Sequence, residues 1–182
     1  MATLTPTRQL TVSEFRQLPD PPGFRIELHD GEVIQVSPPT LKHAKIVKRI
    51  YKLLEARLES QGFVSMEVAF RAQPEFDCRI ADVAFVNKIR YEAADEEDNF
   101  AGSPDLVVEV LSPSNTAAEM YEKERLCLAT GALEFWVVDP QREQVRVSSQ
   151  SGPTRVYSHG ETISLTAFDA NAIPVDEVFS QL

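Results

Sequence analysis

The sequence has little cysteine and no long apolar run, and both features narrow what the chain can be. Its two cysteines, Cys78 and Cys127, show no CxxC spacing and no cluster with histidine. Neither a structural zinc site nor a disulfide framework is therefore indicated. Apolar runs are short and interrupted by charges, so we expect no membrane span. The N-terminus lacks a basic start followed by an apolar segment, so we expect no secretory signal and a reducing, cytoplasmic location.

Positive charge is also scarce, because 18 Lys and Arg stand against 28 Asp and Glu in 182 residues. The net charge of −10 argues that the protein surface as a whole does not bind nucleic acid, because phosphate binding normally uses clustered Lys and Arg. Much of the acidic excess lies in residues 91–99, which we expect to form a solvated loop. Residues 40–60 instead predict an amphipathic helix whose outer side is basic. Four cations recur along that side, here called the basic stripe: Lys42, Lys45, Arg49 and Lys52.

The remaining patterns predict one α/β domain over residues 1–182. Asp30-Gly31 is a strong signal for a hairpin between residues 25–29 and 32–37. Thr116 and Glu119 have capping-box spacing and predict a helix from about 116 to 130. Further strands are expected near 63–71, 80–86, 104–112 and 134–139, with a C-terminal hairpin formed by 144–148 and 155–158. Strands on both sides of helices predict a mixed β-sheet flanked by helices.

Two of the predicted strands carry an acidic residue inside an apolar run. Asp82 interrupts residues 80–86, and Glu109 interrupts residues 104–112. A buried carboxylate without a partner is costly, so it is usually paired with a cation, bound to a metal or placed facing a cleft. If the strands are neighbours, both carboxylates can converge on one side of the sheet. Such oxygen ligands suit Mg²⁺ or Mn²⁺ together with substrate phosphate oxygens, which predicts metal-assisted hydrolysis of a phosphodiester.

Lys123 offers the cation that this chemistry needs near the attacking water. It shares a side of the predicted helix with Met120 and Cys127, so it can point toward the sheet. There its ammonium could orient or help deprotonate a water and stabilise charge at phosphorus. The competing interpretation is structural, with a solvated lysine and each carboxylate paired with a basic neighbour. The candidate neighbours are Arg71, Arg79 and Lys88.

Taken in order along nearly the whole chain, these segments resemble the Uma-type restriction endonucleases, a branch of the PD-(D/E)XK nuclease superfamily. The matching segments are 25–32, 36–39, 79–86, 104–114 and 131–140, together with His43 and Lys123. The resemblance implies a restriction-endonuclease-like core, a divalent metal and DNA as substrate. It makes Asp82 and Glu109 the metal ligands. Lys123 would be a catalytic lysine moved from the strand to the helix.

The resemblance also implies roles for Glu27 and His43, and the sequence departs from the family pattern at two positions. Glu27 matches a glutamate that binds metal directly or through water, although it could instead pair with Arg25 or Lys42. His43 matches a family position, with a local hydrogen bond as the alternative to a phosphate or catalytic contact. Leu111 occupies the place of the superfamily's usual lysine, and Ala81 replaces a proline common in the family.

We therefore predict a Mg²⁺-dependent (or Mn²⁺-dependent) endodeoxyribonuclease. Asp82 and Glu109 would hold the metal, with Lys123 and Glu27 completing the catalytic group. The expected DNA contacts are Lys42, His43, Lys45, Arg49 and Lys52. A homodimer is expected, because cutting both strands generally needs two sites and one chain offers one. The alternative is a catalytically inactive nuclease fold that binds nucleic acid or protein. An enzyme acting on RNA or on a branched junction is a third possibility.

Overall fold

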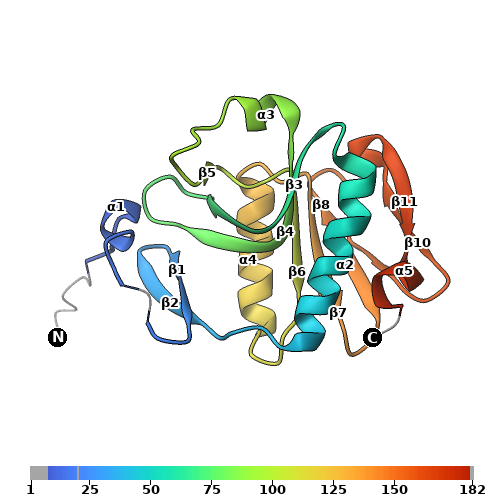
Figure 1. The fold of residues 1–182 in the computed structure, drawn as a ribbon, viewed down its shortest axis with the longest axis horizontal. Coiled ribbons are helices and arrows are strands. Elements are labelled where there is room, and N and C mark those ends of the chain that lie inside the picture. The colour runs from blue at the N-terminus through green and yellow to red at the C-terminus, as the bar shows by residue number, and fades with distance from the viewer. Residues whose placement is uncertain (1–7, 20, 181–182) are drawn as a thin grey trace.

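The computed structural model describes residues 8–19 and 21–180, in which a seven-stranded mixed sheet lies between two helices (Figure 1). The strand order is β5-β3-β4-β6-β7-β8-β9. The bounds are β3 Gly62–Arg71, β4 Arg79–Asn87, β5 Phe100–Ala101, β6 Leu106–Val110, β7 Glu134–Asp139, β8 Gln144–Ser149 and β9 Arg155–Tyr157. Only β3–β5 and β6–β7 pair in parallel, and the other neighbours are antiparallel. The predicted mixed sheet flanked by helices is confirmed.

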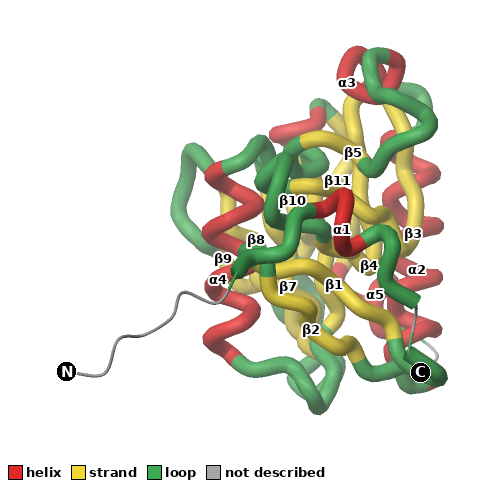
Figure 2. Tube along the Cα trace, turned by 90° about the vertical axis from the view of Figure 1, so that its left-hand side faces the viewer, coloured by secondary structure: helices red, strands yellow, loops and turns green. Residues whose placement is uncertain are grey.

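Helices α2 (Leu41–Leu58) and α4 (Ala117–Ala129) cover opposite faces of this sheet (Figure 2). Helix α2 begins at the Thr40 cap and buries one apolar face, made of Ile46, Val47, Ile50, Leu54 and Leu58. That face joins the larger core with the side chains that β4 and β6 present on the same side of the sheet. The Thr116–Glu119 capping box starts α4, as predicted, and Cys127 packs in the smaller core beneath it.

The N-terminal hairpin forms a separate two-stranded sheet of β1 (Arg25–His29) and β2 (Glu32–Val36). Asp30 and Gly31 both have positive φ, as a tight hairpin turn of this kind requires. Leu28 and Cys78 exchange two backbone hydrogen bonds of 2.9 Å, which hold the hairpin against the segment that leads into β4. The hairpin therefore overhangs one edge of the region where β4 begins.

The C-terminal part contains one predicted hairpin and one that the sequence did not indicate. Strands β8 and β9 pair as expected, and β10 (Thr162–Leu165) and β11 (Ala170–Pro174) form a further two-stranded sheet. The short helices are α1 Val12–Phe15, α3 Lys88–Glu92 and α5 Val175–Phe179, with a 3₁₀ turn at Thr166–Phe168. Throughout the described ranges, no helix has both the length and the apolar character needed to cross a membrane.

Most of the acidic segment 91–99 is exposed, as expected for a solvated loop, but its two ends are held by other structure. It begins within α3, and its Asp98 carboxylate pairs with two arginines. Arg16 comes from the end of α1, and Arg71 ends β3 with an Nη2–Oδ2 distance of 2.6 Å. Two cations offset the desolvation of one carboxylate, so this acidic residue fastens the segment to the body of the protein.

Candidate active site

Asp82 and Glu109 lie where the antiparallel strands β4 and β6 part. Regular pairing runs from Phe85–Leu106 to Val83–Val108, and one further step of this register places Asp82 opposite Glu109. The Asp82 carboxylate accepts the Val110 N–H at 2.8 Å, in the place of a backbone partner on β4. Because opposed residues of an antiparallel pair project to the same side, the two carboxylates converge as the strand patterns predicted.

Glu109 is deeply buried and its close charged neighbour is Lys123. The Lys123 Nζ atom lies 2.8 Å from Glu109 Oε1 and donates to the Ile80 carbonyl at 2.8 Å. At this distance the Lys123 ammonium forms an ion pair with Oε1 of Glu109. The prediction that Lys123 points inward from the helix agrees with this geometry.

The protonation of this pair bears on what Lys123 can do. Burial raises the pKa of Glu109 to about 8, although the lysine charge opposes that rise. Burial alone would lower the pKa of Lys123, but the carboxylates of Glu109 and Glu27 raise it above its usual range. An ammonium held in this way donates hydrogen bonds and supplies charge. It is a poor base, so in any phosphoryl chemistry it would act through its charge rather than by proton abstraction.

Glu27 projects from β1 into the same region and pairs with a histidine that the sequence analysis passed over. Its Oε2 lies 2.8 Å from His29 Nε2, and Oε1 accepts the Ile80 N–H at 3.4 Å. Burial would raise the pKa of Glu27, but the charge of Lys123 and the His29 contact hold it below the ordinary value. The expected alternative partners are engaged elsewhere, since Arg25 pairs with Glu67 and Lys42 donates to a backbone carbonyl.

His43, in the first turn of α2, completes the contacts of Asp82. Its Nε2 lies 3.2 Å from Asp82 Oδ2, and its buried Nδ1 has no hydrogen-bond partner among the described residues. Burial would lower the pKa of His43, but the bond to Asp82 and the charge of that carboxylate raise it. Neither Asp82 nor Glu109 pairs with Arg71, Arg79 or Lys88, the neighbours considered in the structural interpretation.

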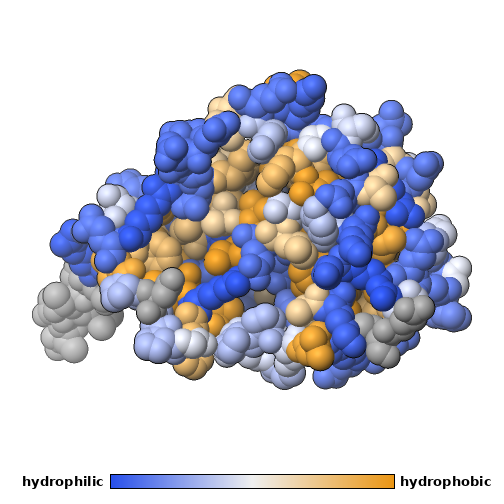
Figure 3. Space-filling view, viewed as in Figure 1, coloured by the Kyte–Doolittle hydropathy of each residue, from blue (hydrophilic) through white to orange (hydrophobic). Residues whose placement is uncertain are grey.

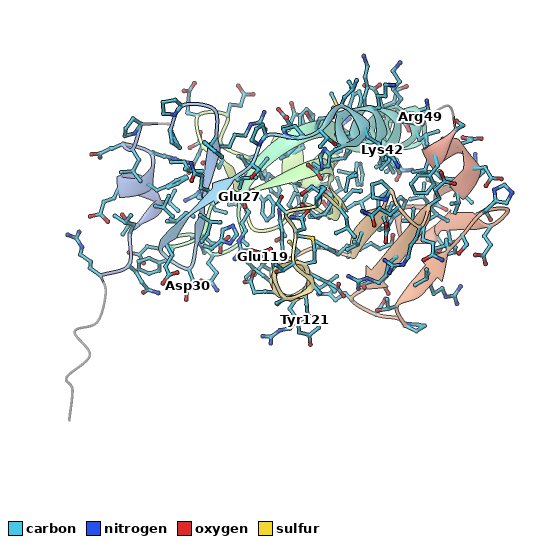
Figure 4. The ribbon with its side chains drawn as sticks, turned by 90° about the horizontal axis from the view of Figure 1, so that it is seen from below. Glu27, Asp30, Lys42, Arg49, Glu119 and Tyr121 are labelled. Carbon is cyan, nitrogen blue, oxygen red and sulfur yellow. The ribbon has the colours of Figure 1, made fainter. Side chains whose placement is uncertain are left out.

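A cavity of about 410 Å³ unites the candidate catalytic residues between the hairpin, α2 and α4. Asp82, Glu109, Lys123, Glu27 and His43 all line it. Figure 4 shows Glu27 reaching from the hairpin toward the space between the two helices. In Figure 3, apolar groups are exposed on this face between the hairpin and α2. The site is thus a recess with charged groups at its base and an apolar surround.

The basic stripe lies away from this recess. At 3.6 residues per turn, its four residues occupy roughly the opposite side of α2 from the cavity-lining His43, Ala44 and Val47. Lys42 donates to the Pro140 carbonyl at 2.8 Å, and Arg49 donates to the Ser180 hydroxyl at 2.6 Å (Figure 4). The α2 lysine that lines the recess is Lys48, which the spacing argument passed over.

The residues present fit a hard divalent ion. Within residues 8–19 and 21–180, no three Asp, Glu, His or Cys side chains form a complete metal cage. Mg²⁺ does not require one, because it commonly takes one or two protein carboxylates and completes its shell with water and phosphate oxygens. Asp82 and Glu109 supply such a pair of oxygen ligands, and both line the recess.

Comparisons with known proteins identify the family through a family model and the fold through a solved structure. The family model described as "Uma2: Putative restriction endonuclease" matches residues 12–176. The curated proteins contain no match. A crystal structure of a putative nuclease belonging to DUF820 from Anabaena variabilis superposes with a TM-score of 0.79 at 21% sequence identity. The alignment covers 94% of this chain and 98% of that one, so the two share a fold over nearly their whole lengths.

Proposed function

Because the chain belongs to the Uma2 family of putative restriction endonucleases, we propose that it is a Mg²⁺-dependent endonuclease that hydrolyses phosphodiester bonds of DNA. The observation that carries the proposal is the meeting of Asp82, Glu109 and Lys123 at the base of one recess. Two carboxylates at a strand opening, with a protonated lysine on one of them, match the needs of metal-assisted phosphoryl transfer.

Each side chain has a part in the proposed reaction. Asp82 and Glu109 would hold the ion, and Glu27 would bind it through water from the hairpin side. When bound, Mg²⁺ supplies a Lewis acid for the phosphoryl oxygens and lowers the pKa of a water. The Lys123 ammonium donates toward the phosphate oxygens and offsets charge that develops in the transition state. His43 keeps the Asp82 carboxylate oriented through its Nε2 contact.

Incubation of purified protein with supercoiled plasmid tests this function directly. The wild type with Mg²⁺ or Mn²⁺ is expected to produce nicked and linear DNA, and EDTA is expected to stop this cleavage.

A second candidate function is a catalytically inactive module that binds nucleic acid. It draws support from the net charge of −10 and from Leu111 at the superfamily's lysine position. Binding without any metal-dependent cleavage would favour this second candidate. Cutting both strands needs two centres, so we also propose a homodimer.

Metal binding is expected to strengthen as the pH rises from 6 to 8. In the metal-free protein the pKa of Glu109 is raised to about 8, so this carboxyl carries a proton at lower pH. A ligating carboxylate must lose that proton, and each pH unit below 8 should therefore weaken apparent affinity by up to about tenfold. Calorimetric titration of Mn²⁺ in two buffers of different ionisation enthalpy measures the affinity and the released proton. Glu109→Gln should release none, and a wild-type affinity that is constant over this pH range contradicts the assignment.

Lys48 and Lys52 provide a matched test of how DNA reaches the recess. We expect Lys48→Ala to weaken DNA binding several-fold and to lower the slope of log affinity against log salt by about 1, since it would remove one phosphate contact. Lys52→Ala removes an equal charge from the basic stripe, one turn further along α2, at a residue that does not line the recess. Fluorescence anisotropy with a labelled duplex at 50 to 200 mM salt measures the DNA affinity of both variants and its salt dependence. A larger loss for Lys52→Ala would assign DNA guidance to the basic stripe of Lys42, Lys45, Arg49 and Lys52 instead.

A further inference from the structure

The buried guanidinium of Arg79 connects the strand that carries Asp82 to the helix that carries Lys123. Only 2% of the Arg79 side chain is exposed. On one side, Nε and Nη2 donate to the Asp77 carboxylate at 3.0 to 3.1 Å. On the other side, Nη1 and Nη2 donate to the two oxygens of Glu122 at 2.7 and 3.0 Å. Two-point contacts of this kind fix direction as well as distance.

Consecutive residues of β4 thereby meet consecutive residues of α4. Arg79 binds Glu122, and the next strand residue, Ile80, accepts a hydrogen bond from Lys123, the next helix residue. The contacts lie side by side where β4 begins and where Lys123 reaches Glu109. Any rotation or sliding of α4 that moves the ammonium must also break the two-point contact of Arg79.

Charged groups contribute much of the packing that fixes the rotation of α4. Its buried residues are Met120, Lys123, Glu124 and Cys127, so half of its buried face is ionic. Methionine is flexible and adapts to its surroundings, so it specifies the rotation of a helix weakly. Near Lys123, the two-point contact of Glu122 with Arg79 fixes the rotation of α4, as a continuous apolar seam does in other helices.

Arg79 itself has little donor capacity left for a substrate, because four of its five N–H groups are engaged. Its side chain borders the recess, but Nε, Nη1 and Nη2 are all engaged by Asp77 and Glu122. Glu122 does not line the recess at all, and 55% of its side chain is exposed. Any effect of this pair on chemistry must therefore pass through the residue beside Glu122.

We propose that Arg79 and Glu122 are positioning residues that hold Lys123 against Glu109 and so set how its ammonium meets the phosphate. The kinetic part of this inference rests on the proposed nuclease function, while the geometric part does not. Glu122→Gln is the informative change, because it keeps the size of a half-exposed side chain and removes the charge that Arg79 binds. The buried Arg79 is left intact and keeps its contact with Asp77, so we expect the variant to fold.

Glu124→Gln is the matched control on the same helix. Glu124 pairs with Arg146 of β8 at 2.6 Å and lies as close to Lys123 in sequence, but it holds α4 to a strand away from the recess. Glu122→Gln should lower kcat for plasmid nicking by about tenfold or more, with KM for DNA unchanged within about twofold. Glu124→Gln should leave kcat within about twofold of the wild type. Equal losses of kcat in the two variants, or no loss in Glu122→Gln, overturn the proposal.

A second measurement needs no cleavage. In protein labelled with ¹⁵N-lysine, a buried and bonded ammonium exchanges its protons slowly and gives a sharp resonance, which Lys123→Arg identifies by its loss. We expect Glu122→Gln to broaden or shift that resonance and Glu124→Gln to leave it in place. If the wild type cuts no DNA while this pattern holds, the nuclease function fails and the positioning stands. If the wild type cuts DNA while both variants leave the resonance unchanged, the positioning fails alone.

Discussion

Asp82→Asn is expected to reduce metal-dependent nicking at least about 10³-fold while leaving the fold intact. The asparagine carbonyl oxygen can still accept the Val110 N–H that Asp82 accepts at 2.8 Å, so the opening between β4 and β6 keeps its shape. What disappears is the negative charge, and a neutral amide is a far weaker ligand for Mg²⁺ than a carboxylate. Initial rates of plasmid nicking over a range of Mg²⁺ concentrations measure the loss.

Asp95→Asn is a suitable control for this change. Asp95 lies in an exposed turn, where its side chain accepts only the Glu97 N–H, so the same chemical change there should be silent. Circular dichroism and thermal unfolding establish that both variants are folded. If Asp82→Asn nicks plasmid at the wild-type rate at saturating Mg²⁺, Asp82 is not a metal ligand and the proposed mechanism is wrong.

Lys123→Met is expected to lower nicking by about 10²- to 10³-fold, because it removes the preorganised cation near the phosphate. The change also acts on the metal-free protein. Without the ammonium, the buried Glu109 carboxyl loses the attraction that now restrains its pKa, which is already raised to about 8. Its pKa should rise further, so the carboxyl stays protonated to higher pH.

The direction of the stability effect follows from that shift. A carboxyl whose pKa is higher in the folded than in the unfolded state binds more protons when folded, so its contribution to stability falls as the pH rises between the two values. For Lys123→Met this interval extends further into the alkaline range. The variant should therefore lose more in Tm at pH 9 than at pH 6, relative to wild type. Differential scanning calorimetry at both values tests this.

Lys88→Met is the matching control, since Lys88 is exposed on α3 and pairs loosely with Glu92 at 3.7 Å. It should change neither nicking nor the pH dependence of Tm. Equal stability losses of Lys123→Met at the two pH values would mean that Glu109 does not titrate as the burial of its carboxyl implies.

Much of the site was predictable, because short-range patterns place its strands and helices. Asp30-Gly31 located the hairpin, the Thr116 cap located α4, and strand alternation put Asp82 and Glu109 on one side of the sheet. The inward direction of Lys123 followed from its helical spacing with Met120 and Cys127. These are properties of a single turn or strand, and the chain carries them locally.

Other features depend on contacts between distant segments. No sequence pattern marks His29 as a site residue. It contributes to the site because the hairpin folds back and brings its partner Glu27 to Ile80. The basic stripe was correctly placed on the outer side of a helix, but which side of that helix borders the recess depends on where the hairpin closes it. The β10–β11 hairpin escaped prediction because its strands are short and rich in small and polar residues.

The residues of the candidate site are widely spaced along the chain, so they emerge from the ribosome at different times. Glu27 comes from the first hairpin, Asp82 and Glu109 from two central strands, and Lys123 from a helix that is synthesised later. Asp82 gains its place only when β6 has docked and offers the Val110 N–H. A ribosome-bound chain that ends before α4 therefore lacks a complete centre. On the proposed nuclease function, cutting ability should therefore arise only after most of the polypeptide has emerged.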